Sequence, residues 1–164
     1  MKIYLVRHGQ SNSADIDPGK NLSDTGKREI IKLAESIKHL GINVDEIWHS
    51  DKARARQTAE ILAAAVKSSK GLIEKSGLKP NDDVKPVAEE IRTYDADLML
   101  VGHLPFMAKL TSLLLTGSEN RCAFEFDAGG LACFDYDKGA FCLNWFIHPG
   151  LIKLEKHDTF QSYH

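Results

Sequence analysis

The stretch that decides the fold is "KIYLVRHGQS", residues 2–11, close to the start of the chain. It begins as an apolar strand and ends in two polar side chains, Arg7 and His8. A second stretch, "DLMLVGH" (97–103), is built the same way and ends in His103. Ligands of open α/β sheets bind beyond the C-terminal ends of the strands. If these two strands are neighbours, both histidines face one crevice.

Strand and helix patterns alternate along most of the chain, which predicts an α/β fold. The expected strands cover 3–6, 45–50, 71–77 and 97–103, and the expected helices cover 22–41, 52–68, 84–94 and 104–117. The stretch 129–147 reads as an antiparallel hairpin. These elements predict a three-layer αβα sandwich with a mostly parallel central sheet and an antiparallel C-terminal hairpin.

Length and composition favour one domain over residues 1–164. The chain is 43% hydrophobic, and its net charge of −2 argues against a nucleic-acid partner. No apolar run is long enough to span a membrane, and "MKIYLV" is too short for a signal peptide. The three cysteines lack metal-ligand spacing, so we expect free thiols, no metal and a cytoplasmic protein.

Two arginines add positive charge to the expected crevice. Arg7 follows the first strand and can hold a phosphate through two parallel hydrogen bonds. Arg54 is in register with the apolar stripe of the expected helix 52–68, whereas Arg56 is in register with its solvent side and with Glu60. Histidines and arginines around one anion suggest phosphoryl transfer. The chain has no P-loop and no acidic cage for magnesium, so we expect neither metal nor cofactor to take part.

Several motifs together resemble the histidine phosphatase superfamily. They are "RHG" after the first strand, "L-[ST]-x-x-G" at 22–26, "S-x-x-x-R-A-x-Q-T-A" at 50–59 and "GH" after the apolar strand 98–101. They occur in order over most of the chain. The resemblance implies a phosphoglycerate mutase-like fold.

The resemblance also implies roles for individual residues. His8 would be the nucleophile and would become phosphohistidine, Arg7 and Arg54 would clamp the phosphate, and His103 would stabilise the transferring group. We expect Gln10 and Ser11 to line the rim and contact substrate.

The chain is similar to compact SixA-type phosphohistidine phosphatases, because little sequence is available for a large cap. The family's general acid has no clear counterpart here, and Asp82 and Asp83 on a loop are the candidates. An imidazole leaving group needs less acid help, which favours phosphohistidine in a protein such as a phosphotransfer domain. A small-molecule phosphomonoesterase, a non-catalytic phosphoprotein-binding module and a metal hydrolase using both histidines are the alternatives. The sequence does not give the oligomeric state.

Overall fold

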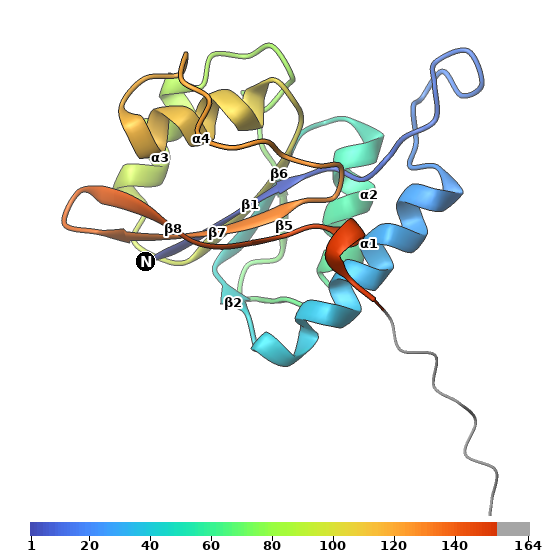
Figure 1. The fold of residues 1–164 in the computed structure, drawn as a ribbon, viewed down its shortest axis with the longest axis horizontal. Helices are drawn as coiled ribbons and strands as arrows, with labels where there is room; N and C mark the ends of the chain where they lie inside the picture. The colour runs from blue at the N-terminus through green and yellow to red at the C-terminus, as the bar shows by residue number, and fades with distance from the viewer. Residues whose placement is uncertain (154–164) are drawn as a thin grey trace, which may run out of the picture.

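A six-stranded sheet forms the middle layer of the protein in a computed structural model, which describes residues 1–153 (Figure 1). Its strands lie in the order β5-β3-β6-β1-β7-β8. They are β1 (Lys2–Arg7), β3 (Glu46–His49), β5 (Leu72–Glu74), β6 (Leu98–Gly102), β7 (Leu131–Asp137) and β8 (Ala140–Ile147). The first four in this order run parallel, and β7 continues the sheet antiparallel to β1 and forms an antiparallel hairpin with β8. The predicted sheet type is confirmed.

Helices cover both faces of this sheet (Figure 1). They are α1 (Asp24–Ile37), α2 (Ala53–Leu62), α3 (Lys85–Thr93) and α4 (Phe106–Thr116), with short 3₁₀ helices η1 (Lys38–Leu40) and η2 (Pro149–Leu151). The first pair packs on one face and the second pair on the other. The three-layer αβα architecture expected from the alternating pattern is therefore confirmed.

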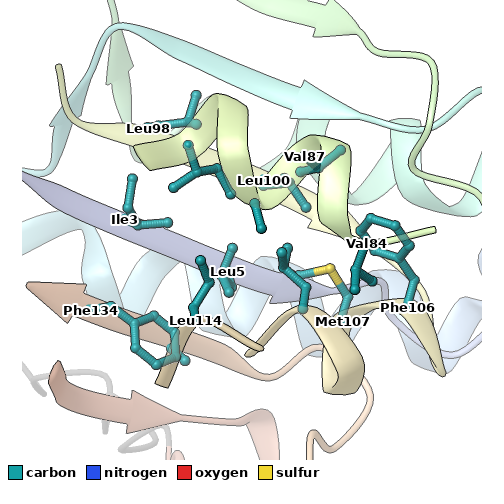
Figure 2. Packing of buried hydrophobic residues seen from close by; sticks show 14 of the residues in the cluster. Ile3, Leu5, Val84, Val87, Leu98, Leu100, Phe106, Met107, Leu114 and Phe134 are labelled. Carbon is teal, nitrogen blue, oxygen red and sulfur yellow. The ribbon is translucent and has the colours of Figure 1, made fainter. Parts of the chain in front are cut away.

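Strand β1 shows why both faces must be covered. Successive side chains of a strand point to opposite faces. Ile3 and Leu5 therefore join the cluster under α3 and α4, which Figure 2 shows with their neighbours, while Tyr4 and Val6 pack on the side of α1 and α2. All four are buried. A strand that is apolar on both faces belongs in the centre of a sheet. The polar residues at its C-terminal end then lie where the parallel strands of the sheet end.

The helix expected over 22–41 is α-helical over Asp24–Ile37 and continues as η1. Two further helix boundaries were wrong. The helix expected over 52–68 ends at Leu62, because Lys67–Ser68 form strand β4 and pair with β2 (Asn43–Val44). The helix expected over 104–117 begins at Phe106, so Pro105 precedes its first turn. Tertiary pairing outweighs the helical pattern in the first case, and proline marks the boundary in the second.

Other expectations concern the chain as a whole. Among the described residues the cysteines are free thiols, as expected. No helix within residues 1–153 is both long and apolar enough to cross a bilayer. The single domain over 1–164 stays a prediction, and its last part, 154–164, lies outside the described residues.

Candidate active site

The ends of β1 and β6 place the two predicted histidines side by side. The strands pair in parallel with Arg7 opposite Gly102, so the next residue of each strand is His8 and His103. The amide N–H of His8 donates to the carbonyl of Gly102 (3.0 Å). The two imidazole rings lie 4.9 Å apart between centroids. Parallel pairing in this register thus brings both rings to one edge of the sheet, as expected from neighbouring strands.

Hydrogen bonds fix the orientation of the His8 ring. Its Nδ1 lies 2.6 Å from the carbonyl oxygen of Gly9, which can only accept, so Nδ1 carries the proton. Nε2 accepts from Nε–H of Arg54 at 3.3 Å. Burial lowers the pKa of His8 to about 4, the Gly9 carbonyl opposes this shift, and the charges of Arg54 and Arg7 add to it. The ring is therefore neutral at physiological pH, and Nε2 is unprotonated, with an electron pair that accepts from Arg54 in the free protein. A nitrogen nucleophile requires such an unprotonated nitrogen.

Two guanidinium groups supply the positive charge beside this ring. Arg7 is held by a bond from Nη1 to the carbonyl of Phe126 (2.6 Å), and its buried Nε has no partner within residues 1–153. Arg54 reaches the Nε2 atom of His8 from the first turn of α2. Burial lowers the pKa of both arginines, although a guanidinium remains charged in proteins. Arg56 points to solvent, 3.8 Å from Glu60, so the structure brings Arg54 and not Arg56 to the site.

His103 is more deeply buried than His8, with 1% of its surface exposed. Its Nε2 lies 2.5 Å from the hydroxyl oxygen of Ser50, which follows β3. Its Nδ1 is buried and has no hydrogen-bond partner in the described part of the chain. Burial lowers the pKa of His103 to about 3, and the neighbouring His8, Arg54 and Lys52 lower it further. Both imidazoles are consequently neutral in the folded protein near pH 7.

The second motif also holds the backbone of the site in place. Thr58 accepts from the amide N–H of Gly9 (3.1 Å) and donates to the carbonyl of Arg54 (2.8 Å). Gln57 accepts from the amide of Leu22 and donates to Asn21, both at 2.8 Å. These bonds tie the segment that follows β1 to the start of α2, so the motif positions His8 as well as Arg54.

Two glycines of the motifs serve close packing. A Cβ at Gly26 would lie 2.1 Å from the carbonyl oxygen of Gln10, and one at Gly9 would lie 2.8 Å from Ile30. The N-cap Ser23, which accepts from the amide of Gly26, also donates to this Gln10 carbonyl. Helix α1 can therefore start directly against the residues that follow His8.

The predicted rim residues lie next to these groups in sequence. Gln10 is exposed, with its side-chain amide 3.5 Å from Glu29, and Ser11 forms a backbone bridge with Leu22. Neither position is tested by these contacts, so substrate binding by Gln10 and Ser11 at the rim stays a prediction.

The candidate acids Asp82 and Asp83 lie in the loop between β5 and α3. Asp82 accepts from the amide of Lys79 (2.9 Å) and Asp83 from the amide of Lys85 (3.0 Å). Each carboxylate therefore shapes the loop. Within residues 1–153 no group of three His, Cys, Asp or Glu side chains is arranged to hold a metal ion.

Sequence reasoning missed three contributors to the site. Ser50, Gln57 and Thr58 all belong to the motif "S-x-x-x-R-A-x-Q-T-A", yet only its arginine received a role. Their fixed spacing from Arg54 was the available signal. The carbonyl of Phe126, which binds Arg7, is a backbone group 119 residues away and has no signature in the sequence.

The sequence of this chain matches one family model and several known proteins. The model of the histidine phosphatase superfamily (branch 1) matches residues 3–79. An uncharacterised protein of Picosynechococcus sp. is 32% identical over 124 residues, which cover 71% of this chain and 74% of that protein. Phosphoglycerate mutase of Candida albicans is 45% identical over 65 residues, which are 37% of this chain and 26% of the mutase.

Solved structures are similar over nearly the whole chain. The protein histidine phosphatase SixA in complex with tungstate superimposes with a TM-score of 0.81 and 22% identity, over 92% of this chain and 98% of SixA. The SixA-type protein of Agrobacterium tumefaciens gives 0.74 and 23%, over 90% and 97%. These structures share the compact fold without a large cap. With its motifs assembled around His8 and its sequence matches to known members, the chain belongs to the histidine phosphatase superfamily.

Proposed function

We propose that this protein is a metal-independent phosphatase that uses His8 as its nucleophile and removes phosphate from phosphohistidine in a protein. Members of its superfamily are phosphatases. One observation carries the proposal: a neutral His8 with its proton fixed on Nδ1 and an unprotonated Nε2 that accepts from Arg54. A phosphotransfer domain is the kind of partner that would present such a substrate.

In the first step, Nε2 of His8 attacks phosphorus. A bond forms between this nitrogen and phosphorus, and the bond from phosphorus to the substrate imidazole breaks. Negative charge is spread over the three phosphoryl oxygens in the transition state. The guanidinium groups of Arg7 and Arg54, and an N–H of His103, would hold that charge in a partly dehydrated site.

In the second step, water attacks the phosphorus of phosphohistidine at His8. Inorganic phosphate leaves and Nε2 regains its electron pair. The bond from Nδ1–H to the Gly9 carbonyl (2.6 Å) keeps the ring in one orientation throughout. The substrate imidazole, which left in the first step, takes up its proton from water.

Two features support phosphohistidine over an alkyl phosphate as substrate. Asp82 and Asp83 each accept a backbone N–H in their own loop, which leaves neither carboxylate held for donating a proton to an alkoxide. Residues 75–84 are all that joins β5 to α3, so this connection adds no large cap over the site, which would leave room for a protein-borne substrate to approach. The fold likeness to the protein histidine phosphatase SixA agrees with this assignment.

The direct test is to trap the intermediate. The protein is mixed with a phosphoramidate or a phosphohistidine-bearing domain, quenched in base, and digested for mass spectrometry. We expect phosphate on His8, loss of turnover in His8→Ala, and activity that is unchanged by a chelator. Full turnover in His8→Ala would refute the nucleophile, and loss of activity with a chelator would favour the metal hydrolase.

A small-molecule phosphomonoesterase is the second candidate, because other solved structures with a similar fold are phosphatases of small molecules. A mutant of the Entamoeba histolytica phosphoserine phosphatase, in complex with phosphoserine, gives a TM-score of 0.66 at 19% identity, over 88% of this chain and 95% of that chain. A panel of phosphoserine, sugar phosphates and phosphohistidine peptides, compared by kcat/KM, separates the two. If a carboxylate donates the proton, Asp82→Asn or Asp83→Asn will reduce turnover of alkyl phosphates and spare phosphoramidates.

A non-catalytic phosphoprotein-binding module would bind phosphate but turn over none of these substrates. The geometry at His8 argues against it, because a binding site has no need for an uncharged nitrogen beside the phosphate. Tight phosphate binding with no hydrolysis of an activated phosphate would favour it.

A further inference from the structure

We propose that Ser50 determines which nitrogen of His103 carries the proton, so that His103 offers a neutral Nδ1–H to a phosphoryl oxygen. This inference rests on the proposed function and adds a positioning residue to it. Ser50 touches the reaction only through His103. The inference starts from the three groups that meet at the Ser50 hydroxyl.

The Ser50 hydroxyl lies in a closed environment, with 1% of the residue exposed. Its oxygen lies 2.5 Å from Nε2 of His103 and accepts from the amide N–H of Lys52 at 3.3 Å. The amide of Lys52 can only donate, so it occupies one electron pair of the oxygen. The proton of the hydroxyl still needs an acceptor, because a buried donor without one is costly.

Only one assignment satisfies all three groups. If Nε2 of His103 carried the proton, the oxygen of Ser50 would accept twice and its own proton would be left without an acceptor. If Nε2 is unprotonated, Ser50 donates to it, and the three groups at the hydroxyl are satisfied, which leaves only Nδ1 of His103 without a partner in the described residues. A neutral imidazole with unprotonated Nε2 carries its proton on Nδ1. The hydroxyl therefore fixes the tautomer of His103.

Nδ1 of His103 is the atom that lacks a partner in the described residues, although it is buried. Buried N–H groups are nearly always hydrogen-bonded, so an unpaired one beside a proposed nucleophile indicates an acceptor that comes with the substrate. The His8 ring lies 4.9 Å away between centroids. A phosphoryl oxygen held between the rings would accept from this N–H, whereas an unprotonated Nδ1 would repel it.

Neutrality of His103 follows from its surroundings. The groups that act on it are His8 at the end of β1, Lys52 and Arg54 at the start of α2, and Asp51 before α2. The positive groups and burial disfavour a further positive charge on the ring, and only Asp51 favours it. The N–H offered to phosphate is thus a neutral donor in the free protein.

The test uses long-range ¹H–¹⁵N NMR spectra of the labelled full chain at about pH 7.5, with His103→Gln to assign the signals. We expect the wild-type protein to carry the His103 proton on Nδ1. Ser50→Ala should move it toward Nε2, and Ser50→Thr should restore it. A wild-type proton on Nε2 would overturn the inference. The spectra need no substrate, so they decide the tautomer even if the proposed phosphatase activity is absent.

Kinetics supply the second readout. Removing one donor outright costs on the order of 10²–10³ in rate, and we expect Ser50→Ala to lose about 10- to 100-fold in kcat because the donor remains in part of the molecules. Ser50→Thr should recover most of this loss. The matched control is Thr111→Val, which removes a hydroxyl that is equally buried and donates only within α4, to the Met107 carbonyl. With an active wild-type protein, equal activity of Ser50→Ala and Thr111→Val would overturn the inference.

Discussion

Lowering the pH should destabilise the folded protein through His8 and His103, the two histidines of the candidate site. Burial lowers the pKa of His8 to about 4 and that of His103 to about 3, from an ordinary value of 6.5. As the pH falls below 6.5, the unfolded chain takes up protons at these positions and the folded protein does not. The free energy of unfolding therefore decreases as the pH falls, until the pH reaches the folded-state pKa values.

The size of the effect follows from the same values. Between about pH 7.5 and about pH 5, the shift at His8 lowers the free energy of unfolding by about 2 kcal/mol. The shift at His103 contributes a similar loss of about 2 kcal/mol. Together they amount to a large share of the stability of a typical small domain.

Urea unfolding at the two pH values measures this loss. His8→Gln and His103→Gln should each lose about 2 kcal/mol less than the wild-type protein over the same interval, since glutamine does not titrate. His39→Gln is the control, because it replaces an exposed imidazole in η1 and should lose as much stability as the wild-type protein. If His8→Gln loses as much stability as the wild-type protein, the buried neutral histidine is not the cause.

Three further variants test how the site is held. Arg54→Ala should lower kcat/KM on the order of 10²–10³-fold in steady-state assays, while Arg56→Ala should stay close to wild type. Gly26→Ala should lower the free energy of unfolding by about 1–3 kcal/mol in urea titrations, because its Cβ would lie 2.1 Å from a backbone oxygen. Gln57→Ala should speed proteolytic cleavage in the segment 12–22, because it removes two bonds that hold this segment; an unchanged cleavage rate would contradict this.

The sequence was sufficient for the framework, because the framework depends on local patterns. The apolar runs of β1 and β6 and their polar ends predicted one shared crevice for both histidines on the condition that the strands are neighbours, and the parallel register with Arg7 opposite Gly102 meets that condition. Helical periodicity likewise separated Arg54 from Arg56. These inferences need only the direction of side chains within one element.

Contacts between segments that are distant in the chain could not be predicted from the sequence. The end of α2 was placed too late, because nothing near Lys67 shows that it will pair with Asn43. The bond from Arg7 to the Phe126 carbonyl depends on where a long loop crosses the sheet. Ser50 was quoted within a motif, but its role appears only when β3 is seen next to β6.

The features that make the site costly to the free protein are those that would hold a phosphoryl group. Two neutral imidazoles are buried, two donors on Arg7 and His103 lack partners in the described residues, and neither Arg7 nor Arg54 forms a salt bridge there. Each of these lowers stability, and each is relieved by an anion that accepts several hydrogen bonds. If these donors bind the phosphoryl oxygens most strongly during transfer, the stability that the free protein gives up at this site is recovered as stabilisation of the transition state.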